Sequence, residues 1–180
     1  KGPMRNGATL FWAGLLYGLA AIGQYAVIKG YLPRTGLMQM GLWFGATTIF
    51  LILGVVFGTM RTRVKGSVSN RAVASVWSSV GLGIVAFIIC TMIIANVIGD
   101  FKALSGVIAP VILIMYGMGW WVSALMSGTQ WLKLISFGCF LGAPAISFLA
   151  DKPEELLAYS FCLFLFAMVP GWVLKSAAKE

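Results

Sequence analysis

The chain has 180 residues, of which 60% are apolar and only 10% are charged, and its mean hydropathy is +0.94. A soluble domain carries roughly a quarter charged residues, so this composition excludes an ordinary water-exposed surface and predicts that most of the surface faces lipid. The net charge is +8, and the chain contains no histidine. The absence of histidine excludes haem ligation by histidine and histidine-based acid–base chemistry.

Six apolar runs follow one another along the chain, separated by short polar links. They cover residues of about 8–28, 37–59, 76–98, 104–126, 131–150 and 156–174. Each is close to the ~20 residues that a helix needs to cross a bilayer, and the links contain the turn residues Pro33, Gly36, Gly99 and Gly128. The sequence therefore predicts an all-α polytopic membrane bundle of about six transmembrane helices, forming a single domain over 1–180 with no soluble domain.

The distribution of lysine and arginine predicts the orientation of the spans, because cytoplasmic loops are enriched in these residues. One side collects nine of them: Lys1, Arg5, Arg61, Arg63, Lys65, Arg71, Lys133, Lys175 and Lys179. The other side collects four: Lys29, Arg34, Lys102 and Lys152. This bias places both termini in the cytoplasm, in a plasma membrane or a bacterial inner membrane. Trp12, Trp77, Trp131 and Trp172 fall near the cytoplasmic ends of their spans, as expected for an interfacial aromatic belt.

Four pairs of glycines stand four residues apart along the apolar runs. The pairs are Gly14 and Gly18, Gly41 and Gly45, Gly54 and Gly58, and Gly138 and Gly142. Glycines at this spacing lie on one helix face, where another backbone can approach closely. They predict either tight packing within the bundle or, most directly at Gly41 and Gly45, a contact with a second copy or another membrane protein.

Neutral polar and aromatic side chains occupy the middle of the runs, where no charged side chain is found. The candidates for a ligand site are Tyr17, Gln24, Asn96, Tyr116, Trp120 and Ser123. Tyr17 and Gln24 are seven residues apart and Tyr116 and Trp120 four apart, so each pair shares a helix face. Such groups suit a neutral or weakly charged ligand, but they serve equally as interhelical hydrogen bonds and packing volume. The absence of mid-span charge argues against transport coupled to protons or sodium through an intramembrane carboxylate.

The longest polar link contains Arg61, Arg63, Lys65 and Arg71. These residues are candidates for binding anionic lipid headgroups, each contributing about 1 kcal/mol near a charged leaflet, or they act only as topology determinants. The basic residues are spread over the membrane edges without a recognition element, so no nucleic-acid partner is predicted.

The sequence contains no catalytic signature such as G-x-S-x-G, H-E-x-x-H or a phosphate-binding loop. The three cysteines, Cys90, Cys139 and Cys162, lie inside apolar runs and are predicted to act as packing residues. We therefore expect no enzyme activity, no metal site and no cofactor.

A short internal match relates the first and fourth runs. Tyr17-Gly18-Leu19-Ala20 resembles Tyr116-Gly117-Met118-Gly119, which would align runs one to three with runs four to six. Because each half holds three spans, the alignment would give an inverted repeat of the kind found in transporters. The match covers only a few small and aromatic residues, a similarity that chance can supply.

Two functions follow from these patterns. The first is a small passive permease or channel subunit for a neutral or weakly charged solute, indicated by the neutral polar groups at membrane depth and by the in-span prolines Pro110, Pro144 and Pro170. The second is a non-catalytic scaffold, sensor or accessory subunit acting through helix–helix contacts, indicated by the glycine pairs. The expected partners are the lipid bilayer and either a second copy or another membrane protein.

Overall fold

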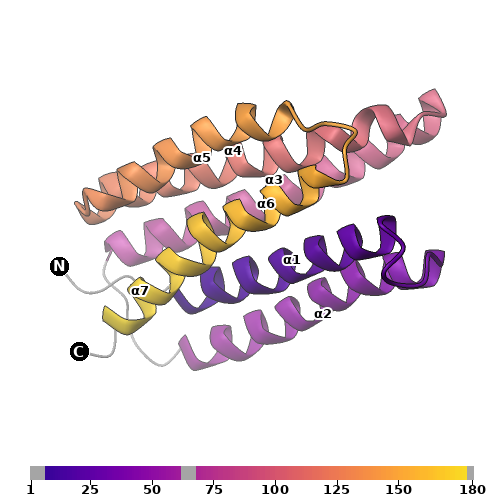
Figure 1. Ribbon diagram of the computed structural model, residues 1–180. Coiled ribbons are helices and arrows are strands. Elements are labelled where there is room, and N and C mark those ends of the chain that lie inside the picture. The colour runs from indigo at the N-terminus through magenta and orange to yellow at the C-terminus, as the bar shows by residue number, and fades with distance from the viewer. Residues whose placement is uncertain (1–6, 62–67, 178–180) are drawn as a thin grey trace. The chain divides into compact units, whose positions relative to one another are not determined.

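The computed structural model describes residues 7–61 and 68–177, with side chains placed at 7–56, 71–102 and 104–177. The helices in chain order are α1 (Gly7–Ile28), α2 (Gly36–Arg61), α3 (Val68–Ile98), α4 (Phe101–Ser127), α5 (Trp131–Ser147), α6 (Glu154–Leu163), the π-helix η1 (Phe164–Met168) and α7 (Val169–Ala177). Turns connect these helices within the described ranges, which contain no strand. The helical segments α6, η1 and α7 form one continuous ribbon (Figure 1). The prediction of an all-α fold is confirmed.

Five helical segments within the described residues are long and apolar enough to cross a membrane. They are Gly7–Ile28, Gly36–Val56, Arg71–Ile98, Leu104–Ser127 and Glu154–Ala177. These segments support an integral membrane location. The remaining apolar helix, α5, has 17 residues and a length of about 25 Å, which is shorter than the hydrocarbon core of ~30 Å. The sixth crossing and the side of the termini stay predictions.

The predicted runs and the helices agree within two residues at most boundaries and differ by three or more at four: the starts of α3 and α4 and the ends of α5 and α7. α3 begins at Val68, so Ser69, Asn70 and Arg71 of the long polar link are helical. α5 ends at Ser147, three residues before the end of the predicted run. Pro144 lies inside α5 and Pro110 inside α4 without interrupting either helix.

Glycine ends three of the helices, as the turn residues predicted. Gly30, Gly99 and Gly128 follow α1, α3 and α4 with φ of +82°, +77° and +71°. This left-handed conformation is available to glycine without a steric penalty, and it is a common way to stop a helix. These three helices therefore end sharply, which allows the short links that follow them.

The chain divides into two compact units. Unit 1 contains α1 and α2 together with the chain from Leu156 onward, and unit 2 runs from Val68 to Glu155 with α3, α4 and α5. In unit 1, α1 packs against α2 and also against η1 and α7. In unit 2, α4 packs against both α3 and α5. Each unit therefore has a central helix with neighbours on two sides.

The π-helix in the last helical segment has a local cause in the sequence. The Val169 N–H donates to Phe164 O, five residues earlier, which widens one turn. Pro170 follows directly and has no N–H to donate, and its ring would clash with a carbonyl in a regular α-helical turn. The wider turn accommodates this proline while the helix continues through α7.

In unit 1 the central helix α1 meets α7 backbone to backbone. A Cβ added at Gly7 would lie 2.6 Å from Gly171 O and 2.5 Å from Lys175 N. A Cβ added at Gly171 would fall against Phe11 N and 2.8 Å from Gly7 O. Only glycine at both positions permits this separation, because any side chain would have to displace backbone.

Candidate functional site

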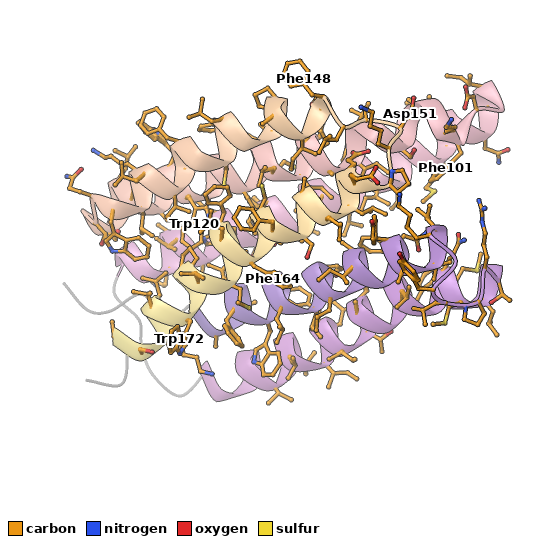
Figure 2. All side chains as sticks on the ribbon, in the orientation of Figure 1. Phe101, Trp120, Phe148, Asp151, Phe164 and Trp172 are labelled. Atoms are coloured by element: carbon orange, nitrogen blue, oxygen red, sulfur yellow. The ribbon has the colours of Figure 1, made fainter. Side chains whose placement is uncertain are left out.

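A specific set of contacts joins the central helix of unit 1 to the last helical segment. The Ser160 hydroxyl donates a hydrogen bond of 2.9 Å to Gly18 O. One turn further along, the Phe164 ring covers Gly18, where an added Cβ would lie 2.5 Å from Phe164 Cε1. Figure 2 labels Phe164 where this segment faces α1. The neighbouring Tyr17 turns to α2, donates 3.2 Å to Thr47 Oγ1 and packs its ring on Phe50.

The same contacts occur in unit 2 between α4 and α5. The Ser136 hydroxyl donates a hydrogen bond of 2.7 Å to Gly117 O. The Phe140 ring, four residues after Ser136, covers Gly117 with its Cε1 atom 2.8 Å from an added Cβ. The neighbouring Tyr116 packs against Trp77 of α3 at 5.5 Å between ring centroids. A Tyr-Gly dipeptide on a central helix facing a Ser-x-x-x-Phe segment, which we name the helix-pair motif, thus occurs once in each unit.

The sequences of the two Ser-x-x-x-Phe segments are also alike. Residues 136–143 read Ser-Phe-Gly-Cys-Phe-Leu-Gly-Ala and residues 160–167 read Ser-Phe-Cys-Leu-Phe-Leu-Phe-Ala, with five of eight positions identical. Both serines and both terminal alanines are buried, whereas the phenylalanine that follows each serine is exposed. The likeness between Tyr17-Gly18 and Tyr116-Gly117 therefore marks a real packing equivalence. The partner of the central helix is α6 with η1 in unit 1 and α5 in unit 2. An alignment of runs one to three with runs four to six does not pair these two partners with each other.

Three of the six predicted ligand residues, Tyr116, Trp120 and Ser123, belong to one packed cluster in unit 2. Trp120 has 0% exposed surface, and its ring meets Trp77 edge-on at 4.8 Å between centroids. Ser123 Oγ accepts a 3.0 Å hydrogen bond from Trp77 Nε1 and donates one of 2.7 Å to Gly119 O. Tyr116 is buried beside them. These side chains hold α3 and α4 together, which leaves the Ser123 hydroxyl already bonded on both its donor and its acceptor side.

The other three predicted ligand residues have different surroundings. Tyr17 is bonded to Thr47, as described above. Asn96 is exposed near the end of α3, 19 residues after Trp77 and so about 28 Å further along the helix. Gln24 lies on α1 with its Oε1 buried and without a hydrogen-bond partner. Within unit 2, Asn96 is therefore apart from the cluster, whereas Tyr17 and Gln24 belong to unit 1.

The glycine pairs have different environments on different helices. Gly14 and Gly18 face the last helical segment, and a Cβ at Gly14 would lie 2.5 Å from Met168 N. In contrast, nothing lies within 4 Å of a Cβ added at Gly41, Gly45 or Gly54 of α2. Gly138 and Gly142 of α5 are half-buried. Gly58 lies in the part of α2 whose side chains are outside the described set.

Of the four basic residues predicted to meet lipid headgroups, one has a described side chain. Arg71 is exposed in the first turns of α3. Arg61 ends α2 with its side chain outside the described set, and Arg63 and Lys65 lie outside the described residues. The lipid-binding role stays a prediction.

An open hollow of about 360 Å³ lies beside the link between α1 and α2. It is lined by Pro33, Thr35, Leu37, Met38, Gly41 and Leu42. Leu42 also covers Gly23 of α1, where an added Cβ would lie 2.9 Å from its Cδ2 atom. Leu42 therefore borders both the hollow and Gly23, the residue before Gln24.

Among the residues that the structure describes, no group of three His, Cys, Asp or Glu side chains is placed to hold a metal ion. The chain matches no known protein-family model, no curated protein and no solved structure.

Proposed function

We propose that this protein is a small passive permease for a neutral or weakly charged solute, with six membrane-spanning helices and both termini in the cytoplasm. The observation that carries the proposal is the helix-pair motif in both units, with the same serine-to-glycine hydrogen bond and the same phenylalanine contact. In a six-span chain the first and fourth spans cross in opposite directions, as do the fifth and sixth. Paired elements that cross a membrane in inverted directions are typical of transporters.

The irregular last segment supports the same proposal. The π-helix and Pro170 together break the regular α-helical hydrogen-bond pattern inside a segment that is long and apolar enough to span a membrane. Irregular backbone at membrane depth is tolerated where it is buried in protein or lines an aqueous path, and π-helical turns occur frequently at functional sites.

The test is solute flux into proteoliposomes that contain the purified protein, with urea, glycerol and acetate as probes. We expect at least one probe to enter faster than it enters protein-free vesicles of the same lipid. The matched variants are Gly18→Leu, which places a side chain on the Phe164 ring, and Gly54→Leu on α2, which points into open space away from the residues that line the hollow. Flux should fall in the first variant and persist in the second. Absence of excess flux for all three probes would overturn the proposal.

A second function is favoured by one observation on α2. Gly41 and Gly45 share a helix face, and neither is approached by another atom of the described chain at its Cβ position. Such a face allows close approach of a helix from another protein, as required of a scaffold or accessory subunit. Vesicles without flux would favour this function over the permease.

A further inference from the structure

The helix-pair motif identifies equivalent positions on the two central helices. Gln24 stands seven residues after Tyr17 on α1, and Ser123 stands seven residues after Tyr116 on α4. Seven residues are about two helical turns, so each polar side chain lies on the same face as the tyrosine of its Tyr-Gly dipeptide. Gln24 and Ser123 are therefore the polar groups that the two units place at corresponding points.

Unit 2 satisfies its polar group from a neighbouring helix. Ser123 Oγ accepts the indole N–H of Trp77 at 3.0 Å and donates to Gly119 O at 2.7 Å. The donor that Ser123 needs is thus supplied by α3, a helix of the same unit. The hydroxyl therefore has both a donor and an acceptor partner within unit 2.

Unit 1 leaves the corresponding group unsatisfied. Gln24 Oε1 is the one buried side-chain oxygen or nitrogen, among the residues that the structure describes, without a hydrogen-bond partner. An amide oxygen that loses water without gaining a donor is unfavourable, and lipid offers no substitute donor. A leucine or methionine would avoid this cost, so the glutamine requires a reason.

Beside this part of α1, Leu42 of α2 contacts both Gly23 and an open hollow. The hollow of about 360 Å³ beside the α1–α2 link is lined in part by Leu42. Leu42 packs over Gly23, the residue before Gln24. One apolar side chain is thus shared by the hollow and by the contact with Gly23.

We propose that Gln24 Oε1 is the hydrogen-bond acceptor for a small neutral solute that carries an O–H or N–H donor. The solute supplies to unit 1 the donor that Trp77 supplies to unit 2. This inference rests on the proposed permease function for the role of the solute as cargo, but binding at Gln24 is measurable without transport. Solutes of similar size without a donor do not bind at Gln24.

Infrared spectroscopy tests the binding step directly, because the chain has only three glutamines: Gln24, Gln39 and Gln130. The protein is labelled with carbon-13 at the side-chain amide carbon of glutamine, and the spectrum of Gln24→Met is subtracted to isolate the carbonyl of Gln24. We expect this band at the high frequency of an unbonded carbonyl, moving to lower frequency with glycerol and not with dimethoxyethane, which lacks a donor. A band that does not move with glycerol overturns the inference, whatever the flux result.

Flux in proteoliposomes provides the second readout. Gln24→Met keeps the length of the side chain and removes the acceptor, so glycerol or urea flux should fall about tenfold, the effect of one lost hydrogen bond of ~1.4 kcal/mol. The control Gln130→Met changes an exposed glutamine in the α4–α5 turn and should leave flux unchanged. The Gln24→Met protein should melt no earlier than the parent, because it loses an unsatisfied group, which separates a binding defect from misfolding. Unchanged flux in Gln24→Met overturns the assignment of Gln24 as the site of the transported solute but keeps the permease. A glycerol-dependent band without any flux keeps the solute site at Gln24 and overturns the permease.

Discussion

The two units pack their helices partly through the same contacts and partly through different side chains. Both use the helix-pair motif, in which a serine donates to a glycine carbonyl and a phenylalanine covers that glycine. Beyond it, unit 1 brings α1 and α7 together through Gly7 and Gly171, whereas unit 2 joins α3 and α4 through large interlocking rings. Apolar side chains gain little by leaving lipid for another helix, so close packing and hydrogen bonds must hold the helices. Backbone contact and aromatic interlock are two ways to obtain that packing.

The largest effect should come from the aromatic cluster of unit 2. Trp120 has no exposed surface and meets Trp77, so Trp120→Ala leaves a cavity and should destabilise the protein by about 4 kcal/mol. Trp172→Ala is the control, because Trp172 is 62% exposed and its loss should cost under about 1 kcal/mol. The free energy of unfolding in mixed micelles measures both. Equal losses would show that the cluster is not the core of unit 2.

The sequence predicts the depth of Trp77 and Trp120 along their helices but not their neighbours. Trp77 lies near the cytoplasmic end of its run, where an interfacial belt is expected, and in the structure it packs on Tyr116 and Trp120 and bonds Ser123. Trp120 and Ser123 were predicted as ligand residues because polar and aromatic groups at membrane depth suit a binding site. Position along a helix shows depth, but it does not show which neighbour turns towards the residue. Only the packing of α3 on α4 distinguishes a binding surface from a core.

A smaller effect, of about 2 kcal/mol, is expected at the backbone contact of unit 1. Gly171→Ala forces a Cβ against Phe11 N and Gly7 O, and backbone atoms cannot move aside as a flexible side chain can. Gly41→Ala is the matched control on α2, where an added Cβ meets nothing within 4 Å and alanine is the better helix former. Melting temperatures of the two variants give the comparison. If the Gly171→Ala protein had the same melting temperature as the Gly41→Ala protein, the close approach of α1 and α7 would be contradicted.

The contrast between these glycines shows how far spacing predicts packing. Gly14 with Gly18 and Gly41 with Gly45 have the same spacing in sequence, yet the first pair meets the last helical segment and the second meets nothing. Four-residue spacing determines which helix face permits close approach, but not whether a partner is present. The all-α fold and most helix ends followed from apolar run length and from glycines such as Gly30 and Gly99. The π-helix before Pro170 did not, because proline alone is compatible with a simple kink.

The helix-pair motif was half visible in the sequence. The likeness of Tyr17-Gly18 to Tyr116-Gly117 indicates a repeat, but an alignment of two successive halves of three spans leaves out the second part of the motif. The second part of the motif lies in residues 136–143 and 160–167, which are 24 positions apart and belong to consecutive runs. Comparing every apolar run with every other would have found their five identical residues. The hydrogen bonds that give this likeness meaning are visible only in the structure.

The smallest effects test whether the two helix pairs are equivalent. Ser136→Ala and Ser160→Ala each remove one interhelical hydrogen bond to a glycine carbonyl, and each should cost about 0.6 kcal/mol. The cost is modest because the carbonyl of a glycine inside a helix keeps its intrahelical bond. Ser147→Ala is the control within α5, since the Ser147 hydroxyl bonds Ala143 O of its own helix and should cost less than either. Equal losses at Ser136 and Ser160, above that at Ser147, would support two equivalent pairs. A loss confined to one of them would mean that the same hydrogen bond stabilises the two units to different extents. The inverted pairing behind the proposed permease would then lose its main support.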